Sequence, residues 1–265
     1  MRPRNTLLLI LLVLCAWGAL HAQKPWREYP GEDRVPTPPD WNVPHEWSTA
    51  RLMYRSGFGF GFGGSGAWAI DYPGGDRNLI EGVRRLTSID VRSVEQAVEI
   101  DDTDDLFNWP FLYAVEPGQW TINEFEGKKL REFLDRGGFL LVDDFHGLQQ
   151  WAEFEAGIRM AFPDEEIEDL PQDDIVFHML SDVDQKVQVA GLAALYRGRT
   201  YEQQSDPFPR WRGIRDAKGR IVVAICFNMD LGDAWEHSDD PGYPEEMAGT
   251  AHRILVNYAT YDLTH

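Results

Sequence analysis

Residues 110–147 read PFLYAVEPGQWTINEFEGKKLREFLDRGGFLLVDDFHG, and this stretch decides the fold. The apolar run 111–115, which follows Pro110, and the later run 139–142 are typical of strands buried on both faces of a sheet. Two parallel strands joined by a crossover helix end at the same edge of their sheet. The acidic turn 143–147 is therefore predicted at the carboxyl edge, where open α/β folds place their ligands.

The residues between the two runs predict the crossover helix. Thr121 and Glu124 have the spacing of a capping box at its start, and the glycine pair 137–138 is typical of its end. The apolar residues of this segment recur at helical spacing and predict one buried face. They are Ile122, Phe125, Leu130, Phe133 and Leu134.

The rest of the chain repeats the alternation of strands and helices. The pattern predicts strands at 51–55 and 89–94, helices at 76–86 and 151–162, a hairpin formed by 211–216 and 220–227, and a last helix from Pro244. The alternation favours an α/β fold, a three-layer sandwich with a mainly parallel central sheet. No internal repeat or second boundary is visible, so residues 49–265 are predicted to form a single domain.

The N-terminus has the pattern of a signal peptide in residues 1–22. Two arginines precede the apolar run 7–20, and Ala22 provides the small residue of a cleavage site. An uncleaved membrane anchor and a lipidated Cys15 are the alternatives. Residues 23–48 are rich in proline and predict an extended tether. The protein is therefore expected to be periplasmic or secreted, with no transmembrane helix once the signal is cleaved.

Composition limits the partners of this chain. Its 265 residues carry a formal charge of −19, which disfavours binding to nucleic acid. After cleavage Cys226 is the single remaining cysteine, so no disulfide can form within the chain. Because it lies in an apolar run, Cys226 is expected to be an inert core thiol.

Two local patterns resemble ligand-binding loops without their context. Residues 57–66 contain glycines at the spacing of a dinucleotide fingerprint, but no helix can follow and no phosphate-binding lysine is present. A nucleotide cofactor is therefore not expected, and the three phenylalanines of this loop predict a flexible loop, a lid or a docking surface. Residues 101–105 are acidic but lack the glycine and the distal glutamate of a calcium loop, which favours a solvated turn.

Five motifs, in order, resemble the bacterial family called domain of unknown function 4159. They are Trp68–Pro73, Phe107–Tyr113, Gly137–Asp144, Asn228–Glu236 and Tyr261–His265. The resemblance covers about residues 48–265. It implies a flavodoxin-like three-layer fold, similar to class I glutamine amidotransferases, and no settled activity. It also implies an association with envelope proteins. Because the turn after strand 139–142 has no cysteine or serine, glutaminase activity is not expected.

With this fold, acidic turns after several strands would meet in one cleft. Its candidate residues are Asp71, Asp143, Asp144, His146, Asn228, Asp230, Asp233, Trp235 and Glu236. One hypothesis is that Asp143, Asp144 and Asp230, with His146, bind a divalent cation that activates water. A second is that two carboxylates act as acid and base on a glycan while Trp235 provides a platform for a sugar ring.

A purely structural role for these acids is the alternative. Asp143 and Asp144 would then cap the following helix, while Asp230 and Asp233 would brace a tight turn around Gly232. The sequence favours an exported envelope protein that binds a ligand or partner, such as a cell-wall glycan or an envelope protein complex. A carboxylate- or metal-dependent hydrolase is the alternative function.

Overall fold

A computed structural model describes residues 38–41, 43–56, 66–100 and 105–265. The predicted signal peptide, most of the predicted tether, residues 57–65 of the glycine-rich loop and residues 101–104 lie outside the described residues. Within the described part of the chain, no helix has the length and apolar character needed to cross a membrane.

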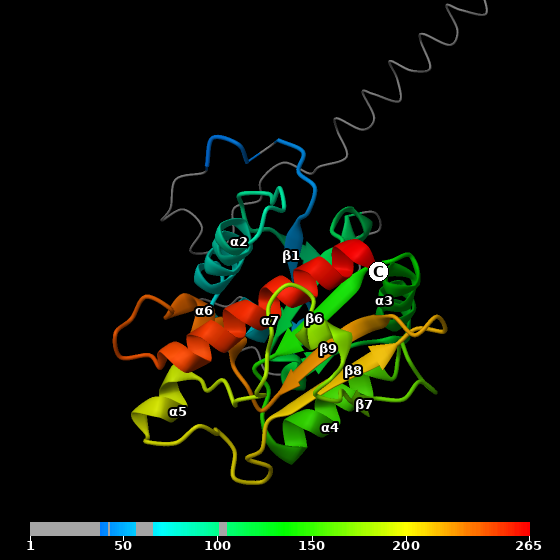
Figure 1. Cartoon of the computed structure of the whole chain (residues 1–265). Helices are drawn as coiled ribbons and strands as arrows, with labels where there is room; N and C mark the ends of the chain where they lie inside the picture. The colour runs from blue at the N-terminus through cyan, green and yellow to red at the C-terminus, as the bar shows by residue number, and fades with distance from the viewer. Residues whose placement is uncertain (1–37, 42, 57–65, 101–104) are drawn as a thin grey trace, which may run out of the picture.

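Seven strands form one sheet in the order β3-β1-β4-β6-β9-β8-β7 (Figure 1). The first five strands of this order pair in parallel, and β8 pairs antiparallel with both of its neighbours, β9 and β7. The sheet is therefore mainly parallel, as the sequence predicts. The strands are β1 (Thr49–Met53), β3 (Ala97–Glu99), β4 (Phe111–Val115), β6 (Phe139–Asp143), β7 (Glu168–Asp169), β8 (Arg210–Arg215) and β9 (Ile221–Phe227). A separate small pair joins β2 (Arg55–Ser56) to β5 (Trp120–Thr121).

Helices cover both faces of the sheet (Figure 1). The core on one face contains residues of α2 (Gly74–Leu86), α6 (Leu231–Glu236) and α7 (Glu245–Thr264). The core on the other face contains residues of α3 (Glu124–Asp135) and α4 (Gly147–Ile158). Alternate residues of β4 and β6 face the two cores, so both strands are buried throughout.

The predicted strand–helix–strand unit is confirmed, but its helix begins later than expected. Asn123 caps α3: its side chain accepts from the Glu126 N–H, and the Glu126 carboxylate accepts from the Asn123 N–H. The predicted box of Thr121 and Glu124 is wrong because Thr121 pairs in β5. Phe125, predicted on the buried face, is 58% exposed, because at 3.6 residues per turn it lies about 140° around the helix from Leu130.

Other element boundaries also differ from the prediction. Residues 89–94 form no strand and make a single bridge, Trp47 to Val91, while the strand beside β1 is β3. The helix predicted at 151–162 begins at Gly147. Leu86, the last residue of α2, is 55% exposed. The hairpin of β8 and β9 is confirmed, and the short helices α5 (Leu192–Tyr196) and α6 were not predicted.

The packed domain includes the end of the segment predicted as a tether. Trp47 is completely buried, packs edge-on against Phe111 at a ring distance of 5.2 Å, and donates its indole N–H to Asp262 of α7. Residue 47 is therefore anchored on the sheet and the last helix.

The strand order creates a switch point at the carboxyl edge. The chain passes from β1 to β3 on one side and then to β4 on the other side of β1. Connections that leave in opposite directions open a crevice beyond the strand ends, the usual ligand position of such sheets.

Candidate functional site

The segments that follow the parallel strands have an unusual backbone. Among the described residues, four non-glycine residues have positive φ: Asp71 (59°), Glu116 (51°), Asp144 (55°) and Asn228 (59°). Glu116, Asp144 and Asn228 directly follow β4, β6 and β9, and Asp71 follows the turn η3 (Ala67–Ala69) and reaches the same edge, beside Asp144. A left-handed residue costs about 1–2 kcal/mol, less for Asp and Asn. Backbone strain of this kind collects at functional sites, and among the described non-glycine residues it occurs at three strand ends and at Asp71, all of which carry polar side chains.

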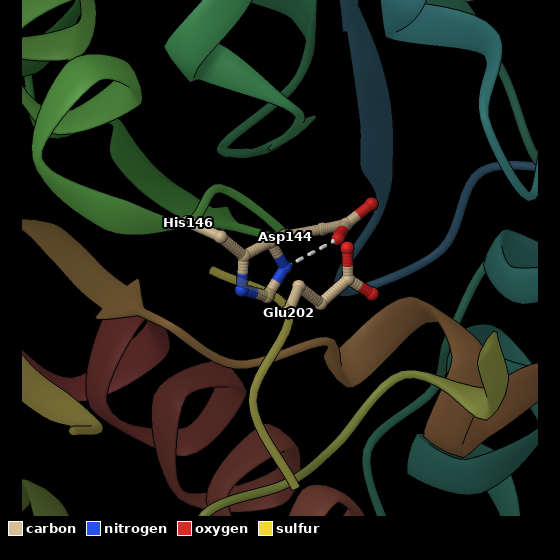
Figure 2. Close-up of side chains that lie close together, drawn as sticks. All are labelled: Asp144, His146 and Glu202. Carbon is tan, nitrogen blue, oxygen red and sulfur yellow. Dashed lines mark hydrogen bonds and ion pairs between the residues drawn. The ribbon is translucent and has the colours of Figure 1, made fainter. Parts of the chain in front are cut away.

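Five carboxyl groups lie close together at this edge, and we call them the acidic cluster. They belong to Asp71, Glu116, Asp144, Glu202 and Asp230. Oxygens of Asp71, Asp144 and Asp230 lie within 4.8 Å of one another, and Asp144, His146 and Glu202 form a second group within the same limit (Figure 2). Asp144 belongs to both groups and is the centre of the cluster.

Two glycines make room for these carboxylates. A Cβ atom at Gly191 would lie 2.7 Å from Asp230 Oδ2 and 2.8 Å from Glu202 Oε1. A Cβ atom at Gly232 would lie 2.6 Å from Asp71 Oδ2. Any larger residue at either position would push the carboxylates apart.

Burial makes the charged state of the cluster costly. It raises the pKa of Asp71, Asp144 and Asp230 well above the usual range of aspartate, and repulsion from neighbouring carboxylates adds to this effect. Burial also raises the pKa of Glu116 to about 7. The cluster therefore requires protons or a cation to be stable at neutral pH.

Arg51 is a completely buried cation beside the cluster. Its guanidinium group forms an ion pair with Asp76 of α2 and donates to the carbonyl oxygens of Trp68 (2.9 Å) and Ile70 (2.7 Å). It also lies over the Tyr113 ring, 4.5 Å from the centroid. Because Ile70 directly precedes Asp71, Arg51 fixes the segment that carries this carboxylate.

Three predicted site residues brace the backbone. Asp143 Oδ2 accepts from the Leu231 N–H at 2.5 Å, and Asp233 Oδ2 accepts from the Leu192 N–H at 2.6 Å. The Asn228 amide accepts from the Gly147 N–H and donates to the Phe208 carbonyl. These contacts are structural, but they are not the ones expected: Asp143 bonds the start of α6 instead of capping the helix that follows it, α4, whose N-cap residue His146 makes no side-chain cap, and this Asp233 oxygen bonds the start of α5. Asp143 belongs to neither of the two groups that contain Asp144. The three aspartates that come together are therefore Asp71, Asp144 and Asp230, instead of the predicted Asp143, Asp144 and Asp230.

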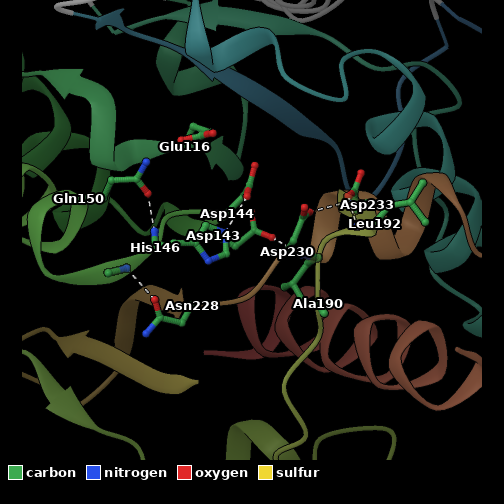
Figure 3. A network of polar contacts seen from close by, with 12 residues as sticks. Glu116, Asp143, Asp144, His146, Gln150, Ala190, Leu192, Asn228, Asp230 and Asp233 are labelled. Atoms are coloured by element: carbon green, nitrogen blue, oxygen red, sulfur yellow. Dashed lines mark hydrogen bonds and ion pairs between the residues drawn. The ribbon is translucent and has the colours of Figure 1, made fainter. Parts of the chain in front are cut away.

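Asp230 combines both roles. Its Oδ1 accepts from the Asp233 N–H at 2.7 Å and caps α6, while the same side chain belongs to the acidic cluster (Figure 3). The expected brace around Gly232 is therefore present, and it also positions a carboxylate of the cluster.

The remaining predicted residues lie at the margins. Trp235 is completely buried and packs edge-on against Tyr113 at a ring distance of 5.3 Å. The sugar platform expected of it is therefore wrong, because a buried ring cannot stack on a ligand. Glu236 is exposed and forms a separate group of possible ligands with Asp233 and His237.

His146 contacts the acidic cluster through one nitrogen of its imidazole ring. Its Nε2 lies 3.0 Å from Asp144 Oδ1, and Nδ1 lies on the side of the ring away from Asp144 and Glu202 (Figure 2). The side chain is 5% exposed, and Nδ1 has no hydrogen-bond partner among the described residues. Burial lowers the pKa of His146 to about 4, so the imidazole is neutral at pH 7.

Glu116, Glu202 and Arg51 were missed by the sequence prediction. Glu116 directly follows the predicted strand 111–115, so its position at a strand end was a signal that could have been used. Glu202 lies on the long connection between α5 and β8, and no sequence pattern indicates that this connection returns to the carboxyl edge.

The raised pKa values predict a pH dependence of stability in the presence of a metal chelator. Burial raises the pKa of Asp143 to about 7, as for Glu116, whereas unfolded carboxyls titrate near about 4. As the pH falls from 8 to 6, the folded chain takes up protons that the unfolded chain does not. The free energy of unfolding, measured with urea, should therefore rise by about 1–2 kcal/mol over this range.

The pH range ends at 6 because histidine acts in the opposite sense and its effect grows toward lower pH: unfolded histidine titrates near about 6.5, so His146 already offsets part of the gain between pH 8 and 6. The depressed pKa of His146 means that the unfolded chain gains a proton there first, which favours unfolding as the pH falls further. Asp143→Asn should reduce the slope between pH 8 and 6. A free energy of unfolding that falls as the pH is lowered from 8 to 6 would contradict the raised pKa values of Asp143 and Glu116.

Comparisons with known proteins give a family without an activity. The family model described as domain of unknown function (DUF4159) matches residues 49–263, nearly all of the folded domain. A search of curated proteins finds no match to the chain.

Proposed function

From the premise that this chain belongs to the family called domain of unknown function 4159, we propose that it binds a divalent cation at the acidic cluster. In this proposal it is a ligand-binding component of the cell envelope. The family name carries no activity, so support comes from the site itself.

The observation that carries the proposal is the convergence of Asp71, Asp144 and Asp230. Their oxygens lie within 4.8 Å of one another, and burial and mutual repulsion raise the pKa of all three. Oδ2 of Asp71 is buried and has no hydrogen-bond partner among the described residues. Carboxylate oxygens are the preferred ligands of Mg²⁺, Mn²⁺ and Ca²⁺, and such a cation would offset the repulsion.

The strand order supports a flavodoxin-like fold. Numbered along the chain, the five parallel strands have the order 2-1-3-4-5, which is that of the flavodoxin type. The likeness to class I glutamine amidotransferases would then be one of fold. Glutaminase activity is not part of the proposal, because residues 143–147 lack a nucleophile and burial raises the pKa of Cys226 well above its ordinary value.

Export is also part of the proposal. Its support is the signal-peptide pattern of residues 1–22, with Arg2 and Arg4 before the apolar run and Ala22 at the cleavage position. A periplasmic or secreted location agrees with cysteine use, since the predicted mature chain keeps one cysteine, in the core.

A metal-dependent hydrolase is the second candidate, and His146 is the observation that favours it. A neutral imidazole beside a cation site can accept a proton from an attacking water. Its Nε2 contacts Asp144, and its Nδ1, which has no partner among the described residues, lies on the far side of the ring, so the attacking water would have to lie on that side. Hydrolysis would require a substrate seated next to His146.

Thermal unfolding after treatment with a chelator tests the proposed cation site. Adding Mg²⁺, Mn²⁺, Ca²⁺ or Zn²⁺ in turn should raise Tm with at least one of them. A cation at 100 times its Kd adds about 2.7 kcal/mol, which corresponds to roughly 5–10 °C for a domain of this size. Asp71→Asn should abolish the rise, because Asn tolerates the left-handed backbone and removes one charged ligand. The absence of any shift with all four cations would refute the proposal.

A further inference from the structure

A hollow of about 550 Å³ lies beside the acidic cluster. Its walls come from the turn η5 (Pro117–Gln119) with β5, from the start of α4, and from Gln203 and Ser205. Neutral hydrogen-bonding side chains predominate in the lining: Gln119, Thr121, Gln149, Gln150, Gln203 and Ser205. A volume of this size is within the range of about 300–1,000 Å³ typical of small-molecule sites.

Three chain segments join the hollow to the acidic cluster. Gln119 lines the hollow and donates its amide to Glu116 at 2.7 Å. His146 lines the hollow and contacts Asp144. Glu202 of the cluster directly precedes Gln203 of the hollow. A molecule in the hollow would therefore lie next to the proposed cation.

The lining of this hollow contains few charged side chains, and this indicates the kind of ligand that it can bind. Glu153 is the one charged side chain among the described lining residues, since the His146 imidazole is neutral at pH 7. The larger hollow of about 720 Å³ between α2 and α7 is lined by charged residues of both signs, including Glu81, Arg85, Asp239 and Arg253. In a chain of which 26% is charged, a wall of amides and hydroxyls favours an uncharged ligand with many donors and acceptors.

The amides at the back of the hollow are held in place. The Gln150 carbonyl accepts from the His146 backbone N–H, and Figure 3 shows its amide nitrogen turned away from His146. The Gln119 amide nitrogen is held by Glu116, which leaves its carbonyl as an acceptor. Fixed donors and acceptors lose little entropy when they bind a ligand.

His146 provides the second sign of a ligand. A buried nitrogen without a partner costs about 1–3 kcal/mol. Nδ1 of His146 is such an atom among the described residues, and its ring lines the hollow. A ligand hydroxyl at this position would satisfy it.

We propose that this hollow binds a short neutral glycan, with one sugar hydroxyl bonded to Nδ1 of His146. The side-chain amides and hydroxyls of the walls bind the remaining hydroxyls. The inference rests on the proposed function because it places the sugar beside the bound cation, and it assigns the ligand class of the same site.

Isothermal titration of the full chain with neutral oligosaccharides tests this inference. The probes are N-acetylglucosamine and glucose oligomers of two to four residues, with and without the cation that raises Tm. At least one should bind. Gln203→Ala should weaken that binding by about 10-fold, which is the loss of about 1.4 kcal/mol of contacts. The matched control is Gln204→Ala, because Gln204 is equally exposed in the same loop but bonds to Tyr201 instead of lining the hollow.

Cation binding is measured in parallel and separates the two proposals. Gln203→Ala should keep the full cation-dependent rise in Tm. If the cation binds but no oligosaccharide does, or if neutral peptides bind in place of sugars, the glycan assignment is wrong and the cation site stands. If oligosaccharides bind without any cation response, the hollow is a glycan site and the proposed function fails. If Gln203→Ala and Gln204→Ala lose the same amount of oligosaccharide affinity, the assignment of the glycan to this hollow is also wrong.

Discussion

Arg51→Met should lower the free energy of unfolding by about 3–5 kcal/mol, the cost of breaking a buried ion pair by removing one partner. Arg51 is completely buried, and its partner Asp76 is 1% exposed, so the substitution leaves a buried carboxylate without its cation. The carbonyl oxygens of Trp68 and Ile70 lose a donor as well. Urea unfolding at pH 7.5 measures the change.

The matched control is Arg85→Met on the exposed side of α2. Arg85 pairs with Glu81 one turn earlier, but its side chain is 72% exposed, so the loss should stay below about 1 kcal/mol. The double variant Arg51→Met/Asp76→Leu should recover part of the loss, because the uncompensated charge is then gone. A loss below 1 kcal/mol for Arg51→Met alone would show that water or another group replaces the pair.

Arg51→Met should also weaken the cation response, for a reason separate from stability. Arg51 fixes the carbonyl of Ile70, and Asp71 follows with φ of 59°. Without this anchor the Asp71 carboxylate is free to move away from Asp144 and Asp230. The affinity for the cation, measured by calorimetric titration at a temperature where the variant is fully folded, should therefore be lower than that of the wild type.

The main elements were predictable because their signals are local. The apolar runs of β4 and β6 and the glycines after α3 decide the central unit without help from distant residues. The start of α3 was missed because two capping patterns overlap, and pairing of Thr121 with Arg55 in the small sheet decides between them. That pairing joins residues 66 positions apart, which no local pattern reveals.

The strand β3 shows a second limit of sequence reasoning. Its three residues, Ala97–Glu99, are too few for a periodic pattern, whereas residues 89–94 alternate like a strand without forming one. Position beside β1 makes Ala97–Glu99 a strand, through parallel pairs such as Leu52 with Val98. Tertiary contacts therefore determine which segment forms the strand beside β1, as they often do for short strands.

Acids close to strand ends predicted part of the candidate site. Asp144 directly follows β6, Asp230 lies three residues after the end of β9, and both belong to the acidic cluster, whereas Glu116, which directly follows β4, was missed. The division of roles between neighbours was not predictable: Asp143 bonds the Leu231 N–H while Asp144 joins the cluster, although the two are adjacent in sequence. Alternation of side chains at the strand end and the left-handed backbone of Asp144 separate them, and both are properties of the folded chain.

Asp144→Asn should abolish cation binding and, in a chelator, leave the domain as stable as the wild type or more stable. Both effects have one cause, because Asp144 is 5% exposed and is repelled most strongly by Asp230 and Glu116. Removing its charge relieves this repulsion when no cation is present, but removes the ligand common to both groups of the cluster. Asparagine is tolerated at the φ of 55° found there, so the backbone should not add a penalty of its own.

Two measurements together test Asp144→Asn: the urea midpoint in a chelator and the cation-dependent rise in Tm. Affinity for the cation should fall by at least about 100-fold, the upper range seen when even an outer partner of a metal ligand is lost. Asp173→Asn is the matched control, because it makes the same change in net charge at an exposed position outside the acidic cluster and should keep both wild-type values. A variant that loses apo stability but keeps its cation response would assign Asp144 a structural role. The expected result for Asp144→Asn is a more stable apo domain that no longer responds to the cation. This combination is expected only if the chain keeps the destabilising repulsion at Asp144 because the carboxylate is needed to bind a cation.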